Sequence, residues 1–305
     1  MPNKVKIGLI NDSVNMLDHF VALDLGLYKD QGLDVELVKQ PNFGSLTGVD
    51  SGEILLTSAT PRVVQSILLK DARYKFVLIT RKNPPHYIVS RPEIRTVAGL
   101  RNKTIWSSGP GSGNYYMTID WLRENGLEPG VDVHVRHFGE DQSTVFSTAS
   151  PPSWIHSLMK MAFDGLMCVP PEREWLVELA GYHSLVDLCQ KYPDRMIHGL
   201  ATTAGTLKTM PDLVRGAVRA HCRAAEIIRN DSKVTVACIA KRWKLVDRVA
   251  ERVWTSVKDC FIASTDSIWL EALFANHKRH LEHTHPERRV SNPNIKELLD
   301  GSFAP

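Results

Sequence analysis

The stretch of this chain best suited to hold an anion is a turn rich in glycine and serine. It runs from Ser107 to Tyr116 (SSGPGSGNYY), after an extended run over 103–106 and before an amphipathic helical run over 117–125. A strand, such a turn and a helix present free backbone N–H groups at the positive end of the helix dipole. The turn lacks the Lys-Ser/Thr of a phosphate-binding loop and the spacing of a dinucleotide site. We therefore expect its residues to bind a ligand or to cap the helix.

Three side chains could support acid–base chemistry on a small acid. His19 could protonate a carbanion left by loss of CO₂, and Asp12 could act as a base. Arg81, at the end of an extended run, could bind a carboxylate through two parallel hydrogen bonds, and Arg62 is a second candidate for that role. Two of these residues have an ordinary alternative, since His19 could be an ordinary helix histidine and Asp12 could cap the helix.

Other reactive side chains give weaker signals. Cys168 follows a short strand, but the sequence shows no base for it, so we expect a buried thiol. Histidines at 277, 280, 283 and 285 lie among charged residues and are expected on a solvated helix rather than around a metal ion. The five cysteines form no C-x-x-C pair and are expected to be reduced. No cofactor and no metal are predicted.

Composition excludes several partner classes. The chain has 305 residues, 43% hydrophobic and 23% charged, with a net charge of +3. These values are ordinary for a globular protein and predict neither nucleic-acid binding nor membrane insertion. The first residues run straight into a strand without the apolar segment of a signal peptide. The sequence as given is thus expected to be cytoplasmic, or periplasmic if a leader has been trimmed from it.

The elements that must position these residues alternate between extended and helical patterns. Extended runs lie over 5–10, 33–38, 54–56 and 74–80, each followed by a loop and a helical run. This order predicts an α/β fold with a parallel sheet covered by helices on both faces. From residue 211 onward the pattern is mainly helical.

Several segments carry a family resemblance. They are 26–35 (GLYKDQGLDV), 97–104 (VAGLRNKT), 111–113 (GSG) and 121–129 (WLRENGLEP) with Asp132-Val133, and more weakly 211–220. On these residues the chain resembles the type II periplasmic-binding-protein fold, in its nitrate/sulfonate/taurine and thiamine-pyrimidine-precursor (NMT1/THI5-like) branch. It departs from the family over 163–168 (FDGLMC), where aspartate and glycine are exchanged in order, and in lacking an export signal.

The resemblance implies two doubly wound α/β domains joined by a hinge, with additional C-terminal helices. Domain 1 would comprise residues 1–85 and 199–305, domain 2 residues 86–198, and the ligand would bind in the cleft between them. The loops that correspond to the family's cleft contain the expected ligand-binding residues Asn11, Ser13, Phe43, Ser58, Thr60, Arg62, Ser108, Gly111, Ser112, Gly113, Asn114, Tyr115, Phe138, Cys168 and Thr202.

Two functions are compatible with this resemblance. The first is binding of a small anionic or heterocyclic organic molecule by an ABC-transporter-type substrate-binding protein, with an ABC permease as partner if the protein is exported. The alternative is a cofactor-independent cytoplasmic lyase, a decarboxylase or dehydratase of an aromatic or cyclic carboxylic acid. Such an enzyme would resemble 4,5-dihydroxyphthalate decarboxylase and would use His19, Asp12 and Arg81. The aryl-sulfinate desulfinase and pyrimidine synthase of this fold are disfavoured, because the Arg-x-Gly-Gly of the first and the cysteine cluster of the second are missing.

Overall fold

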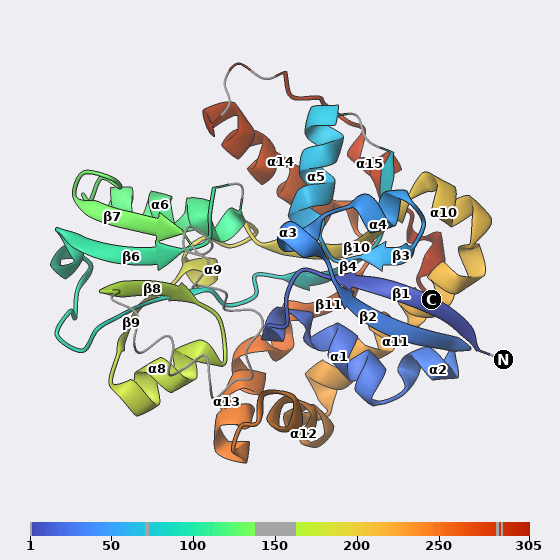
Figure 1. The fold of residues 1–305 in the computed structure, drawn as a ribbon, viewed down its shortest axis with the longest axis horizontal. Coiled ribbons are helices and arrows are strands. Elements are labelled where there is room, and N and C mark those ends of the chain that lie inside the picture. The colour runs from blue at the N-terminus through green and yellow to red at the C-terminus, as the bar shows by residue number, and fades with distance from the viewer. Residues whose placement is uncertain (1, 71–72, 111, 138–162, 285–286, 288) are drawn as a thin grey trace. The chain divides into compact units, whose positions relative to one another are not determined.

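The chain divides into two units in the computed structural model, which describes residues 2–70, 73–110, 112–137, 163–284, 287 and 289–305 (Figure 1). Unit 1 comprises Met1–Pro84, Ile197–Cys238 and Lys258–Pro305, and unit 2 comprises Pro85–Met196 and Ile239–Val257. The chain passes between the units four times. These passages fall between residues 84 and 85, 196 and 197, 238 and 239, and 257 and 258, so residues 239–257, which lie within the range expected for domain 1, group with unit 2.

Unit 1 is built on a six-stranded sheet of order β11-β4-β10-β3-β1-β2. Strands β1, β2 and β3 are parallel, and β10 runs antiparallel between β3 and β4, so β3 and β4 share one direction. The carboxyl ends of β1, β3 and β4 therefore meet at one edge of the sheet. The strands are β1 (Asn3–Leu9), β2 (Leu33–Lys39), β3 (Ile54–Thr57), β4 (Tyr74–Lys82), β10 (Ile197–Thr203) and β11 (Phe261–Ser264).

Helices pack on this sheet in two groups. Helices α1, α2 and α11 contact one another, and α11 also contacts β4 and β11. In the second group, α14 contacts both β4 and β10, α5 contacts β10, and α15 contacts β4. Helix α14 also contacts α5 and α15. The helical segments are η1 (Val14–Met16), α1 (Leu17–Asp24), α2 (Leu27–Asp30), α3 (Pro41–Gly44), α4 (Thr47–Asp50), α5 (Thr60–Lys70), α10 (Ala204–Thr209), α11 (Pro211–Asn230), η3 (Lys258–Cys260), α14 (Ser267–Thr284), α15 (Ile295–Leu298) and η4 (Gly301–Phe303).

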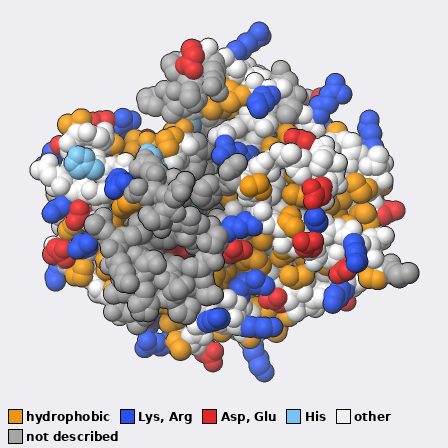
Figure 2. Space-filling model, viewed as in Figure 1, with side chains coloured by type: hydrophobic (Ala, Val, Ile, Leu, Met, Phe, Trp, Pro, Cys, Tyr) orange, Lys and Arg blue, Asp and Glu red, His pale blue; other side chains and the backbone are white. Residues whose placement is uncertain are grey.

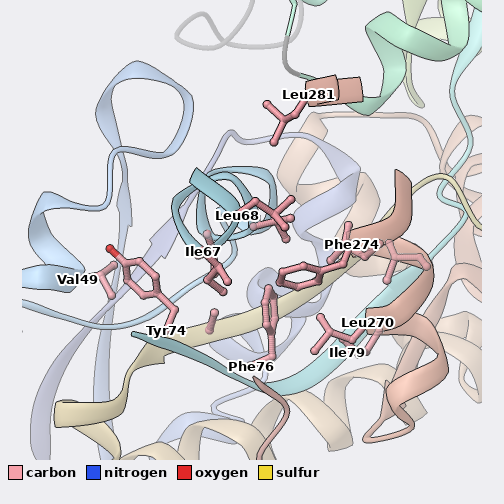
Figure 3. Packing of buried hydrophobic residues seen from close by; sticks show 14 of the residues in the cluster. Val49, Ile67, Leu68, Tyr74, Phe76, Ile79, Leu270, Phe274 and Leu281 are labelled. Atoms are coloured by element: carbon pink, nitrogen blue, oxygen red, sulfur yellow. The ribbon is translucent and has the colours of Figure 1, made fainter. Parts of the chain in front are cut away.

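A hydrophobic cluster joins α5 and α14 to the sheet of unit 1. Ile67 and Leu68 of α5 and Phe274 of α14 pack with Phe76 of β4, and all four side chains are at least 96% buried (Figure 3). The rings of Phe76 and Phe274 meet edge to face, with centroids 6.5 Å apart. Burial of this apolar surface stabilises the sheet whose edge carries the candidate site.

Unit 2 has a five-stranded sheet of order β7-β6-β8-β5-β9. Strand β6 is parallel to β7 and β8, and β5 is antiparallel to β8 and β9. The strands are β5 (Tyr87–Ser90), β6 (Lys103–Ser107), β7 (Val133–His137), β8 (Gly165–Cys168) and β9 (His183–Asp187), and the helical segments are η2 (Val97–Leu100), α6 (Gly113–Glu124), α8 (Glu172–Ala180), α9 (Leu188–Lys191) and α13 (Asp247–Val257), with α12 (Ser232–Trp243) leading into the unit.

The two faces of this sheet have separate cores because neighbouring residues of a strand point to opposite sides. Ile105 packs with Met117 and Trp121 of α6, and Trp106, the next residue, packs with Trp175 and Leu176 of α8. Helix α13 contacts α8, and Leu245, just before α13, packs against the second cluster. These contacts explain why residues 239–257 group with unit 2.

The architecture confirms the predicted α/β class, although both sheets are mixed rather than purely parallel. On the face shown in Figure 2, Lys and Arg side chains lie among Asp and Glu side chains, in keeping with the small net charge. None of the described helices is long and apolar enough to cross a membrane.

Candidate functional site

A buried group of five polar side chains in unit 1 contains two of the three residues predicted to act on a small acid. Asp18 is its centre, and one carboxylate oxygen, Oδ1, accepts from Nη1 of Arg81 at 2.8 Å and from Nδ1 of His19 at 3.0 Å. The other oxygen, Oδ2, accepts from Nδ1 of His221 at 3.1 Å, and Nε2 of His221 lies 2.8 Å from the hydroxyl of Tyr28. None of the five residues is more than 1% exposed.

Four elements bring these side chains together. Asp18 and His19 are on α1, Tyr28 is on α2, His221 is on α11, and Arg81 is near the carboxyl end of β4. Because a carboxylate only accepts hydrogen bonds, the Nδ1 atom of each imidazole must carry a proton. In the neutral ring of His19, Nε2 is then an acceptor, and this buried atom has no hydrogen-bond partner among the described residues.

The electrostatics of the group favour a single ion pair between Asp18 and Arg81. Burial alone would raise the pKa of Asp18, but His19 and Arg81, with hydrogen bonds from both imidazoles, hold it well below its usual value. Burial lowers the pKa of His19 to about 4, against the opposing effect of Asp18, so this ring is neutral at pH 7. Burial also lowers the pKa of Arg81, which remains charged because an arginine starts from a very high value.

The same donor set invites a comparison with a metal site. Asp18, His19 and His221 offer ligand atoms within 4.8 Å of one another, the one such group found among the described residues. A cation there would have to displace the Arg81 guanidinium from Asp18 and would meet two protonated Nδ1 atoms. The geometry therefore describes a buried ion pair solvated by imidazoles.

Asp12 is not part of this group, although the sequence placed it with His19 and Arg81. Its carboxylate is 60% exposed and lies 3.3 Å from Nζ of Lys39. In the same loop, Asn11 accepts hydrogen bonds from the backbone and hydroxyl of Ser13, and Ser13 caps η1 through the amide of Asn15. The hydrogen bonds of this loop thus organise the chain between β1 and α1.

Two predicted ligand-binding hydroxyls of unit 1 bind its own backbone. Ser58 donates to the carbonyl of Gly8 at 3.1 Å, and Thr60 donates to the carbonyl of Gly199 at 3.1 Å and accepts from its amide at 3.0 Å. Arg62 is exposed on the first turn of α5. Thr202 is buried and pairs with Lys75 in the sheet, whereas Arg81 pairs with His198. Thr202 therefore lies at the edge of the sheet opposite Arg81, away from the other predicted residues.

In unit 2 the structure brings together the residues of the glycine- and serine-rich turn. Asn114 donates to the hydroxyl of Ser108 at 3.0 Å, and Ser112 donates to the carbonyl of Gly109 at 2.8 Å. The side chain of Asn114 also accepts from the amide of Tyr115 at 3.0 Å. Ser112 is the N-cap residue of α6 but makes no side-chain capping bond, so the first-turn amide of Tyr115 is bonded by Asn114, which lies inside the helix, rather than by the serines. A Cβ atom at Gly113 would lie 2.6 Å from the sulfur of Met196, so a larger residue there would displace the Met196 side chain.

Of the remaining residues predicted to bind a ligand, the structure describes the side chains of Tyr115 and Cys168. The ring of Tyr115 meets that of His137 edge to face, with centroids 5.1 Å apart. Cys168 is 6% exposed, and burial raises the pKa of its thiol well above the usual value, with smaller effects of Glu172 and Glu174. It is therefore the buried thiol that the sequence predicted rather than a nucleophile. Gly111, Phe138 and the side chain of Phe43 lie outside the described residues.

The sequence analysis missed two carboxyl groups next to Cys168. Glu172 and Glu174 begin α8, and the Oε2 atom of each is buried without a hydrogen-bond partner among the described residues. Burial raises the pKa of Glu172 to about 8, an effect that the nearby Glu174 increases. An acidic helix start is ordinary in sequence, and only the structure shows that one oxygen of each carboxyl is buried.

Replacing Glu172 with glutamine is expected to remove part of the pH dependence of stability. Because the pKa of Glu172 is raised on folding, its contribution is fully present below about pH 4.5 and is lost as the pH rises toward 8. The residue is partly exposed, so we expect a loss of only about 1–2 kcal/mol between about pH 5 and pH 8. Urea unfolding should show this loss in the wild type and in a surface control, Glu36→Gln, but not in Glu172→Gln. Equal pH slopes in all three proteins would contradict the assignment.

Comparison with known proteins matches nearly the whole chain in fold and one part of it in sequence. The alkanesulfonate-binding protein SsuA from Xanthomonas axonopodis pv. citri, bound to MOPS, superposes with a TM-score of 0.73 at 15% identity, covering 98% of each chain. The periplasmic aliphatic sulphonate-binding protein SsuA from Escherichia coli gives 0.72 at 14% identity, covering 98% of this chain and 97% of that one. A variant of the desulfurization enzyme DSZB in complex with biphenyl-2-sulfinic acid also gives 0.72 at 14% identity, covering 99% and 98%.

These matches define the chain as a protein of the type II periplasmic-binding-protein fold, as predicted. Residues 13–146 match the model of the family described as NMT1/THI5 like, which confirms over this part of the chain the family predicted from the sequence. None of the curated protein sequences compared matches the chain significantly. At 14–15% identity the likeness to solved structures concerns the fold, which these sulfonate-binding proteins share with a desulfurization enzyme.

Proposed function

We propose that this protein binds a small anionic or heterocyclic organic molecule as a substrate-binding protein of the ABC-transporter type. The observation that carries the proposal is the correspondence of fold over 98% of both chains with a sulfonate-binding protein. On this proposal an exported form would deliver its ligand to an ABC permease.

The positions of the polar residues support binding at the carboxyl ends of strands. In unit 2, Ser108, Ser112 and Asn114 form a hydrogen-bonded turn between β6 and the start of α6. In unit 1, Arg81 stands near the carboxyl end of β4. Ligands of open α/β sheets bind at this end, where loops and helix N-termini meet.

The lyase alternative has lost part of its basis. It required Asp12 as a base beside His19 and Arg81, but Asp12 is a surface residue near Lys39, and the carboxylate next to His19 is Asp18, already bonded to three donors. A base needs a free lone pair directed at the proton that it removes. We therefore propose binding without turnover.

The test is native mass spectrometry of the purified protein after incubation with a pool of aromatic carboxylates, sulfonates and pyrimidines. We expect one compound to be retained at its original mass, with nothing in the pool consumed. A compound that loses the mass of CO₂ or water would overturn the proposal in favour of the lyase. Retention of no compound from any class would also contradict it.

Replacing Asn114 with alanine is expected to weaken binding of the retained compound at least about tenfold, equivalent to about 1.4 kcal/mol. The change removes the donor to Ser108 and the acceptor for the amide of Tyr115, and so disorganises the turn. Asn125→Ala, at the other end of α6, is the matched control, because the side chain of Asn125 donates only to the carbonyl of Trp121 in the described contacts. Calorimetric titration should show a loss in the first variant alone. Equal affinities in both variants would remove the turn from the site.

A further inference from the structure

The guanidinium of Arg81 has one hydrogen-bonding edge that its surroundings leave unused. Asp18 accepts only from Nη1, while Nε and Nη2 are buried and have no hydrogen-bond partner among the described residues. The whole side chain is 0% exposed. Nε–H and one Nη2–H point in the same direction from the planar group, so together they form a two-donor fork.

Asp18 does not bond to this fork. Both lone pairs of its Oδ1 atom are used by Arg81 and His19, and its Oδ2 atom accepts from His221. These bonds, extended by the hydroxyl of Tyr28, hold the guanidinium from its Nη1 side. The ring of Phe261 lies 5.9 Å from Cζ and offers no acceptor oxygen. Buried N–H groups without acceptors are costly and rare in folded proteins, so a pair of them on one charged group calls for a partner.

The position of the fork suits a ligand. Arg81 lies near the carboxyl end of β4, paired with His198 of β10 on one side and with Phe261 of β11 on the other. This is the edge of the unit 1 sheet at which β1 and β3 also end, and open α/β sheets bind their ligands at such an edge.

We propose that the Nε–Nη2 fork of Arg81 binds the oxyanion, carboxylate or sulfonate, of the organic ligand. Two oxygens of such a group match the spacing of the two donors, which a neutral amide or a ring nitrogen cannot do. This inference rests on the proposed function and narrows it, because it selects the anionic members of the ligand classes named there. Asp18 neutralises part of the charge of Arg81 in the free protein and fixes its orientation.

The test is NMR of the arginine Nε–H groups of the wild-type protein, titrated separately with methanesulfonate, acetate and chloride. The Arg81 resonance is assigned by its loss in Arg81→Lys or, should that variant not fold, by cross-peaks with the Phe261 ring. We expect it to shift and saturate with methanesulfonate, acetate or both, and not with chloride. Arg223, which is exposed on α11 and bonded to Glu226, is the internal control. The preferred ion distinguishes a sulfonate site from a carboxylate site.

A second measurement compares benzenesulfonate and benzoate with their neutral amides by calorimetry. We expect the anions to bind at least tenfold more tightly than the amides, and Arg81→Lys to lose that preference while Arg223→Lys keeps it. An Arg81 resonance that is unchanged while an organic compound is retained would overturn this inference and leave the proposed function standing. A shifted resonance with no compound retained would do the reverse, and neither signal would overturn both.

Discussion

Replacing Asp18 with asparagine is expected to lower the free energy of unfolding by about 3–5 kcal/mol, because it removes the counter-charge of a fully buried arginine. The amide that replaces the carboxylate would also turn donor hydrogens toward Arg81, His19 or His221, each of which is itself a donor to Asp18. The loss exceeds that of an ordinary hydrogen bond because no other described carboxylate bonds to this guanidinium.

Urea unfolding at pH 7 measures this loss, with Asp12→Asn as the matched control. Asp12 is 60% exposed beside Lys39, and its replacement should change stability by less than about 0.5 kcal/mol. A change below about 1 kcal/mol in Asp18→Asn would show that Asp18 is not the main partner of Arg81.

The second large effect concerns pH. Burial lowers the pKa of His19 from 6.5 to about 4. Between these two pH values the unfolded chain therefore binds a proton at this residue that the folded protein does not bind. Stability from this group is complete above pH 6.5 and is lost as the pH falls toward 4, by about 3 kcal/mol in total. Asp18 adds a loss of the same sign at lower pH, because its pKa in the folded protein lies well below 3.8.

Unfolding measured over a series of pH values separates the two groups. His19→Gln should lose the dependence between about pH 6.5 and pH 4 and keep the steeper loss in stronger acid. His134→Gln, at an exposed position of β7, should follow the wild type throughout. If His19→Gln and the wild type have the same profile, His19 is not held neutral by burial.

The fold could be predicted because each of its helices and strands is indicated by a short, local sequence pattern. Alternating strands, capped helices and the segments around 26–35 and 121–129 each show their structure within about ten residues, and their order then implies the α/β class. The antiparallel edge strands β9 and β11 were not predicted. They are four or five residues long and partly exposed, and their place in the sheets depends on pairing with distant strands.

The candidate site was harder to predict because its partners are distant in sequence. His19 and Arg81 were singled out, but Asp18, which joins them, looked like one more helix carboxylate, and His221 lies 203 residues further along the chain. A residue type at a strand end shows which chemistry is available but not whether folding will bury it. Asp12 shows the same limit, since it lies in the loop after β1 as expected but its side chain is exposed to solvent.

The return of residues 239–257 to unit 2 has a consequence for dividing the molecule into parts. Leu245 packs against the cluster around Trp175, and Arg248 and Arg252 form ion pairs with Glu178 of α8. A fragment of residues 85–196 alone would therefore lack the Leu245 side chain that packs on this cluster and both cations that pair with Glu178. An isolated unit 2 therefore has to include the later segment as well, joined by a linker or supplied as a second peptide.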